Sequence, residues 1–486
     1  MFRSLAAPIG AVLLLAGCSL EPAYQRPEPP IPASYPAFSR ATLNATVDAK
    51  SAPSKRATPD IGWRDFLGDP RLDRLVELAL INNRDYRVSL LNVEAARAQY
   101  QVAELGFLPT FQAQGALNRS HSPENTLKSG ERSLSSSYSV GAYSAWEIDL
   151  FGRTLSLKRE ALNQFFAVEE NRKAAQMTLV SAVANQYLML VACDAQLDVT
   201  ANTLKAAEGQ LKITQNEFAQ GTVSELDVES AETVVAQAQA AQQEQMRNRA
   251  QTQDALVLLV GSDLPANLPP GLPLDSQKIL TDIPAELPSD LLHRRPDIVA
   301  AEETLKAANA SIGAARAAFF PEISLTGNFG SESKQLSGLF KPGSTAWAFG
   351  PQISLPIFDA GQNEANLDLA HIQKRIEIAS YEKAIQTAFQ EVSDGLAARS
   401  AYEIQIKSLE RSQASLERIL RISNNRFNSG VDSYLTVLTA ETNLYTTQQA
   451  LIAARLAQLT NLVDLYQYLG GGWIEHTDDR PRAPDV

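Results

Sequence analysis

Apolar residues between Gly361 and Phe427 recur every three or four positions, and this spacing predicts one long α-helix with a continuous apolar seam. The spacing stops at Asn428-Ser429-Gly430 and resumes from Tyr434 to about Leu469. Because glycine adopts positive φ easily, Gly430 is suited to a tight turn. We therefore expect a long helix, a sharp turn and a returning helix, which at 1.5 Å per residue span roughly 100 Å and roughly 50 Å.

The same pattern occurs earlier in the chain. Residues 218–226 match residues 427–435, with an offset of 430 − 221 = 209, and Phe107-Leu108-Pro109 recurs as Phe319-Phe320-Pro321. The earlier pattern predicts a long helix from Arg153 to about Gln220 and a return helix from Glu225 to Val260. The chain is therefore interpreted as a duplicated unit.

The apolar period changes from 3.6 to 2 ahead of each long helix. This alternation predicts one β-hairpin at about residues 108–150 and another at about residues 321–357. The large apolar residues fall on one face of each strand, and the other face is small or polar. They include Phe111, Tyr138, Trp146, Phe329, Trp347 and Phe349. Such strands are typical of a transmembrane β-barrel, although the strand pattern alone also fits two hairpins packed on a soluble core.

Four strands cannot close a barrel, and open strand edges are not tolerated in lipid. The smallest membrane barrels have about 8 strands. We therefore expect an oligomer. Two chains would give about 8 strands and three would give about 12, and this arithmetic leaves both open.

The N-terminus has a cationic residue, an apolar run and then Leu15-Ala16-Gly17-Cys18. This sequence resembles the bacterial lipoprotein box, which implies that residues 1–17 are a signal peptide and that Cys18 is acylated. Ser19 at the next position implies sorting to the outer membrane. The alternative is an ordinary signal peptide with a chance cysteine. Residues 18–60 are rich in proline and are interpreted as an acylated N-terminus and an extended tether.

The remaining boundaries follow from the repeat and from proline content. The first repeat covers residues 61–260 and turns at 221–224, and a Pro-rich connector covers 261–288. The second repeat covers 289–470 and turns at 430–433, and a C-terminal tail at 471–486 is expected to be loose.

Composition excludes several classes of function. A net charge of −12 argues against a nucleic-acid surface, and two cysteines cannot form a disulfide framework. The four histidines fall in different predicted elements, so we expect no metal site and no cofactor. Ser331-x-x-Lys334 imitates an acyl-enzyme motif but falls in a hairpin loop. The protein is not expected to be an enzyme.

Several motifs together resemble the outer-membrane factor family of TolC-like channels, and within it the OprM-type lipoproteins of multidrug efflux. The motifs are residues 15–20, 61–64, 145–153, 291–297, 314–321, 383–391 and 470–473. The resemblance covers essentially the whole mature chain. It implies a mainly α fold with a transmembrane β-barrel, in which a homotrimer forms a 12-stranded barrel continued by a long α-helical barrel.

The resemblance also implies a function and partners. The chain would be a passive duct in the Gram-negative outer membrane, lipid-anchored and with a large periplasmic portion. It would export antibiotics, solvents or other toxic small molecules, together with a periplasmic adaptor protein and an inner-membrane RND-type pump. Two alternatives remain, a duct for type I protein or peptide secretion and a periplasmic lipoprotein scaffold without a pore. The lipoprotein box favours drug efflux over secretion, and the amphipathic strands oppose the scaffold.

Two sets of site residues are carried over from the family. Adaptors of the family dock on the helical tips, which here are Gly221, Thr222, Val223 and Ser224 in the first copy and Gly430, Val431, Asp432 and Ser433 in the second. The family often narrows its periplasmic aperture with carboxylates just after the second turn. Both matching positions, Thr436 and Thr439, are threonine in this chain. The gate candidates are therefore Leu226, Asp227, Leu435, Thr436 and Thr439.

Overall fold

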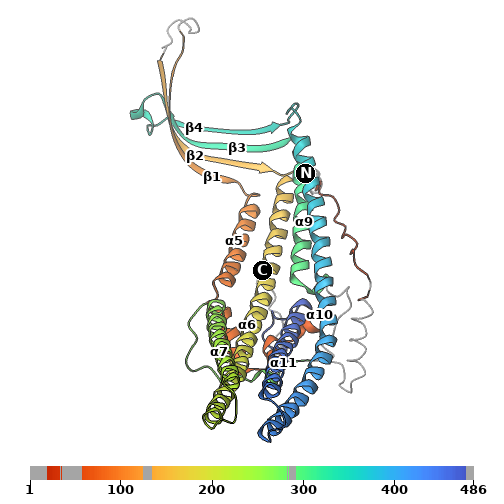
Figure 1. The fold of residues 1–486 in the computed structure, drawn as a ribbon. Coiled ribbons are helices and arrows are strands. Elements are labelled where there is room, and N and C mark those ends of the chain that lie inside the picture. The colour runs from red at the N-terminus through yellow and green to blue at the C-terminus, as the bar shows by residue number, and fades with distance from the viewer. Residues whose placement is uncertain are drawn as a thin grey trace. The chain divides into compact units, whose positions relative to one another are not determined.

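The computed structural model describes residues 19–32, 34–35, 57–123, 134–281, 283 and 292–477. Two long helices and their return helices dominate the described chain (Figure 1). The helices are α3 (Trp63–Leu67), α4 (Pro70–Asn82), α5 (Arg84–Leu105), α6 (Arg153–Ala219), α7 (Glu225–Val260), α9 (Pro296–Ala317), α10 (Gln362–Asn428) and α11 (Tyr434–Tyr468). The strands are β1 (Thr110–His121), β2 (Leu134–Ile148), β3 (Glu322–Ser333) and β4 (Thr345–Ser354).

The helix boundaries agree closely with the apolar periodicity. Helices α6 and α10 have 67 residues each, and α7 and α11 return after the turns at Gly221 and Gly430. The two predicted long helices and their returns are therefore confirmed. By length and composition α6 also passes as a candidate membrane span, but 67% of its most apolar window is buried, as in the core helix of a soluble domain.

The chain divides into two compact units. The sheet unit contains residues 1–28, 92–169 and 300–382, and the core unit contains residues 29–91, 170–299 and 383–486. The boundary falls inside α5, α6, α9 and α10. Each unit takes segments from both sequence copies, so the compact units do not coincide with the repeats.

The sheet unit holds one antiparallel sheet in the order β1-β2-β3-β4. Strand β2 of the first copy pairs with β3 of the second, for example through Trp146 opposite Leu325. The two predicted hairpins therefore form a single four-stranded sheet, and β1 and β4 are its edges. The alternation predicted from the sequence matches the register, since directly opposed residues share a face.

An aspartate just before each long helix accepts hydrogen bonds from backbone N–H groups at the start of that helix. Asp149 accepts hydrogen bonds from the backbone N–H of Arg153 at 2.7 Å and of Leu155 at 2.8 Å. In the second copy, Asp359 accepts from the N–H of Asn363 at 2.8 Å and of Gly361 at 3.1 Å. These carboxylates satisfy orphan donors at the helix N-termini and favour the helix dipole, so both strand-to-helix junctions are fixed in the same way.

The core unit is built around α3 and α4. Trp63, Phe66 and Leu72 are at most 1% exposed, and burial of each such side chain contributes about 1.5–3 kcal/mol. The Phe66 ring stacks on Tyr466 of α11 with centroids 4.0 Å apart. Tyr466 also donates its hydroxyl to the carbonyl of Ile61 at 2.6 Å. Elements from both ends of the chain therefore share one core.

The first residues of the C-terminal tail belong to this core unit. The N–H of Trp63 donates to the carbonyl of Ile474 at 2.9 Å, and Arg64 Nε donates to Glu475 at 2.7 Å. The expectation of a loose tail is therefore wrong for residues 471–477, because pairing with residues 62–65 offsets the entropy of ordering them. Residues 478–486 lie outside the described part, as do the signal peptide, Cys18, most of the tether and part of the connector.

Candidate functional site

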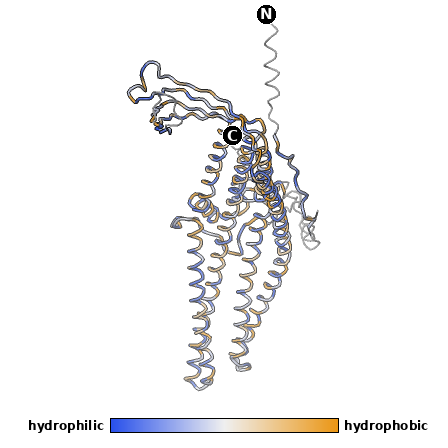
Figure 2. Tube along the Cα trace, turned by 90° about the horizontal axis from the view of Figure 1, so that it is seen from above, coloured by the Kyte–Doolittle hydropathy of each residue, from blue (hydrophilic) through white to orange (hydrophobic). Residues whose placement is uncertain are grey.

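One face of the sheet carries an exposed apolar surface. Phe111, Phe329, Trp347, Phe349 and Ile353 are between 65% and 76% exposed, and the register places all five on the same face. The opposite face carries small and polar residues. Figure 2 colours the chain by hydropathy, and the strands can be followed as alternating hydrophobic and hydrophilic positions. A surface this apolar is unusual on a soluble domain and indicates an apolar environment.

A hydrogen bond fixes the indole ring of Trp146, near the C-terminal end of β2. Trp146 donates its indole N–H to the carbonyl of Phe107 at 2.8 Å while its ring shares the apolar face. An aromatic ring with one polar atom satisfied is typical of membrane interfaces, where one end of the side chain is apolar and the other is hydrated. The Trp146 environment is therefore consistent with a position where the apolar surface meets water.

The first helical turn ends α6 and starts α7. Gly221 has a φ of 75°, and the N–H of Thr222 donates to the carbonyl of Glu217 at 3.0 Å. This is the Schellman geometry, in which a left-handed residue closes the helix end. Ser224 and Asp227 then form a capping box at the start of α7. The side chain of Asp227, a gate candidate, is thus hydrogen-bonded to Ser224 within its own helix.

The second turn has the same backbone geometry, but a different side-chain interaction stabilises it. Gly430 has a φ of 70°, and the N–H of Val431 donates to the carbonyl of Arg426 at 2.9 Å. Ser433 makes no side-chain cap bond. Instead, Arg426 donates two hydrogen bonds to Asp432, at 2.6 and 2.9 Å, and this lowers the pKa of the Asp432 carboxyl. Both turns are therefore rigid and exposed.

The gate candidates lie on the first turns of the return helices. Leu226 is 74% exposed and Leu435 is 68% exposed. Thr439 donates its hydroxyl to the carbonyl of Leu435 at 2.8 Å, and Thr436 is exposed. The two leucines are counterparts in the two copies, so each chain presents two equivalent apolar side chains beside its turns. A constriction built from them remains a proposal.

The segment that directly follows Cys18 is clamped on α9 within the sheet unit. Arg26 donates to both oxygens of Glu302, at 2.9 and 2.6 Å, and Glu302 is 3% exposed. Asn309 donates to the carbonyl of Pro22 at 2.8 Å, and Arg316 donates to the carbonyl of Leu20 at 3.2 Å. The tether is therefore extended but bound over residues 19–28.

Sequence reasoning missed this clamp and one other ion-pair group. Arg295 is 9% exposed at its side chain and donates to Asp297 at 2.6 Å and to Glu391 at 2.7 Å. It also donates to the carbonyl of Tyr468 at 3.1 Å. Each group depends on a contact between residues far apart in sequence, Arg26 with Glu302 and Arg295 with Glu391, so neither periodicity nor spacing could have located them.

The serine of the acyl-enzyme-like motif has a structural role. Ser331, the first residue of the acyl-enzyme-like motif, lies in β3 and donates its hydroxyl to the carbonyl of Leu339 and to Ser344. Among the described residues, no group of three His, Cys, Asp or Glu side chains could hold a metal ion.

Comparisons with known proteins agree on one family. The model of the outer membrane efflux protein family matches residues 75–262 and 287–471. The antibiotic efflux pump outer membrane protein ArpC of Pseudomonas putida and the toluene efflux pump outer membrane protein TtgC of the same species are each 45% identical over 100% of this chain and 99% of their own.

Solved structures give the same result for the fold. The open state of the MtrE outer membrane channel of Neisseria gonorrhoeae superimposes with a TM-score of 0.84 and 36% identity, covering 95% of this chain and 100% of that one.

Proposed function

Because the chain belongs to the outer membrane efflux protein family, we propose that it is the outer-membrane exit channel of a tripartite multidrug efflux pump. Three copies would contribute their four strands each to one β-barrel, and their long helices would continue it as an α-helical barrel. The channel would be a passive duct, and the driving force would come from a pump in the inner membrane.

The observation that carries this proposal is the sheet. It presents a continuous exposed apolar face and has two unpaired edges, β1 and β4. In hydrocarbon every backbone polar group needs a partner, so such a sheet is stable in lipid only when its edges are closed. Closure by further copies of the same chain satisfies the edges and turns the apolar face outward to lipid.

The substrates are proposed from the relatives. The names of the two relatives cited above refer to toluene and to antibiotics, which are organic molecules harmful to the cell. We infer that this chain exports compounds of that kind. Because these proteins match over the full chain, the proposal does not depend on one domain alone.

The partners are proposed from the turns. The exposed, rigid turns at residues 221–224 and 430–433 would receive a periplasmic adaptor protein, which would connect the duct to an RND-type pump. The leucines beside the turns, Leu226 and Leu435, would narrow the periplasmic end, with Asp227, Thr436 and Thr439 beside them. Acylation at Cys18 would add a lipid anchor to the clamped N-terminal segment.

A pair of substitutions on one strand tests the membrane assignment. Phe349 lies on the apolar face of β4 and Gln352 lies on the opposite face. Phe349→Asp should remove the protein from the outer membrane and abolish resistance in a host that lacks its own exit duct, because a charged side chain that faces lipid destabilises a membrane barrel. Gln352→Asp adds the same charge to the other face and should leave both intact.

The readouts are outer-membrane fractionation and the minimal inhibitory concentration of an exported antibiotic. Equal tolerance of both substitutions would mean that the apolar face does not meet lipid, and the channel proposal would then fail.

A further inference from the structure

The core unit contains a pocket between its two helical hairpins. It has a volume of about 560 Å³, which lies within the range of small-molecule sites. Its walls come from α6, α7, α10 and α11, and every lining residue belongs to the core unit.

Well-packed clusters bound the pocket on both sides along the helices. Toward the turns, Ala231, Tyr434 and Val437 form a buried cluster. Farther from the turns, Ala192, Leu274 and Ile452 form another. The pocket residues of α6 and α11 fall between these clusters in sequence. The helices therefore pack closely at both clusters and leave a space in the stretch between the two clusters.

The pocket walls are mostly apolar and made of small side chains. Val199, Ala207, Val234, Ala238, Leu420 and Leu438 are among the lining residues. Hydroxyl and amide side chains line the same space, and two of them are already paired, since Thr200 and Tyr445 share a hydrogen bond of 3.3 Å. A space that joins apolar walls to polar groups can hold the apolar body of a small organic molecule and fix its orientation.

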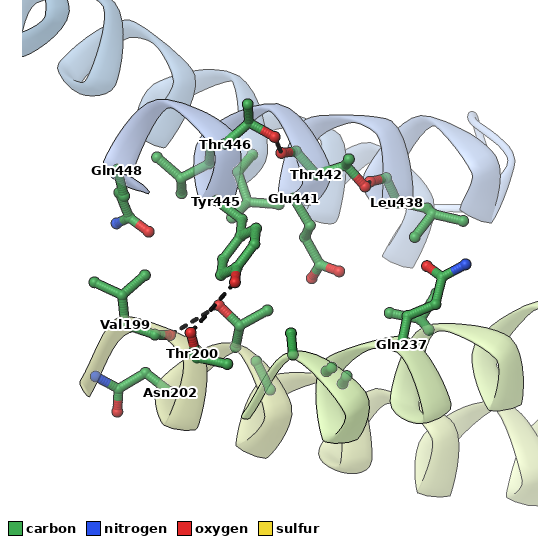
Figure 3. Close-up of a pocket in the computed structure, with 18 residues that line it drawn as sticks. Val199, Thr200, Asn202, Gln237, Leu438, Glu441, Thr442, Tyr445, Thr446 and Gln448 are labelled. Atoms are coloured by element: carbon green, nitrogen blue, oxygen red, sulfur yellow. Dashed lines mark hydrogen bonds between the residues drawn. The ribbon is translucent and has the colours of Figure 1, made fainter. Parts of the chain in front are cut away.

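Glu441 is the one ionisable carboxyl in this lining, and no lysine, arginine or histidine lines the pocket. Figure 3 shows Glu441 and Tyr445 pointing from α11 toward the facing helices. The side chain is half-buried, and burial raises the pKa of the Glu441 carboxyl. A carboxylate in such a place is stabilised by a bound cation, because an unpaired charge away from water is costly.

We propose that this pocket binds amphipathic organic cations of single charge, with Glu441 as the counter-ion and the apolar walls holding the rest of the molecule. Glu441 has no second carboxylate, histidine or cysteine beside it in the lining, so the pocket does not suit a divalent metal ion, and an anion would be repelled. The proposal concerns binding and does not depend on the proposed export function.

The duplication supplies a matched control. Glu232 stands 209 positions before Glu441 in the same Ala-Glu-Thr sequence, since 441 − 232 = 209, but it is exposed and does not line the pocket. Glu441→Gln and Glu232→Gln therefore make the same chemical change in the two copies. Only the first removes charge from the pocket.

The test measures binding of ethidium, an organic cation, and of the neutral probe N-phenyl-1-naphthylamine to the purified full-length protein in nonionic detergent. Fluorescence anisotropy gives the two affinities. Glu441→Gln should weaken ethidium binding about tenfold, which is about 1.4 kcal/mol, and change the neutral probe less than twofold. Glu232→Gln should change neither affinity. Equal ethidium affinity in Glu441→Gln and the parent, or equal losses in both variants, would overturn the proposal.

A second variant keeps the test decisive if Glu441→Gln fails to assemble. Ala238 lines the pocket and is 8% exposed, so Ala238→Leu fills part of the space. It should weaken binding of both probes while size-exclusion chromatography shows an unchanged assembly. Unchanged ethidium binding in Ala238→Leu would place the cation elsewhere and refute the site.

Discussion

At the scale of single residues, several carboxyl groups of the described chain are partly buried, and burial raises their pKa values. Asp73 of α4 is the one with the largest consequence for stability. Burial raises its pKa to about 6, Asp69 and Asp65 add to the effect, and Arg64 opposes it. One of its oxygens is buried without a hydrogen-bond partner. Such a group is held at some cost to the folded state.

The sign of that cost follows from proton linkage. The unfolded chain has a pKa of 3.8 at this group and the folded chain about 6, so the folded state binds the proton more tightly. Stability therefore falls as pH rises from about 4 to about 6, and the full penalty is present above that window.

Asp73→Asn should therefore stabilise the protein at pH 7.5 and have little effect at pH 3.5. The shift corresponds to about 3 kcal/mol, and solvent screening at this half-buried position reduces the expected gain to about 1 kcal/mol. Thermal unfolding in detergent should show a midpoint raised by about 2 °C at pH 7.5. The control is Asp254→Asn on the exposed face of α7. A gain that is the same at both pH values would contradict the assignment.

At the scale of elements, the two turns have the same backbone conformation, and this decides which of their residues can be used to test adaptor docking. A Cβ atom at Gly221 or Gly430 would meet no other atom within 4 Å, so a substitution there is opposed by positive φ alone. The strain is about 1 kcal/mol and confounds any test of docking at the glycines. Val431 is the better position, because it is 62% exposed and contributes only its backbone to the turn.

Val431→Glu should abolish efflux and leave the assembled protein in the outer membrane. A charge on an exposed apolar side chain removes a contact with the proposed adaptor but no contact within the turn. Ethidium accumulation in cells reports efflux, and native electrophoresis reports assembly. Val431→Thr, which keeps the shape without the charge, should retain efflux. Normal efflux by Val431→Glu would remove this turn from the docking surface.

Local elements were predictable from the sequence, and contacts between them were not. The alternation around Phe349 and the glycine at 430 placed strands and turns correctly because both signals are local. Pairing of β2 with β3 joins the two copies, and Arg26 reaches Glu302 across 276 residues. Such contacts depend on how helices and strands pack against one another, and the residue pattern within one helix or strand does not predict its packing partner.

At the scale of the whole molecule, barrel closure requires more than one copy of the chain. Four strands per chain give about 8 strands in a dimer and about 12 in a trimer. The long seams also leave Ile376 and Ile419 about half exposed in the single chain, at 51% and 47%. Neighbouring helices in an assembly would cover such side chains.

Membership of the outer membrane efflux protein family favours the trimer, so the detergent-solubilised protein should have three times the mass of one mature chain. Multi-angle light scattering, corrected for bound detergent, measures that mass directly. A mass of two chains would contradict the trimer, and a single chain soluble without detergent would contradict the channel itself.

The two edges of the sheet have a genetic consequence. Since β1 and β4 are different strands, each seam of a closed ring joins unlike edges, and every chain takes part in two seams. A chain damaged only at β1 can still join a neighbour through β4 and so enter a ring that cannot close. In a cell that makes equal amounts of unaltered and altered chains, about one three-chain ring in eight would contain only unaltered chains. Lesions at one edge should therefore behave as dominant alleles, whereas lesions that prevent folding altogether should be recessive.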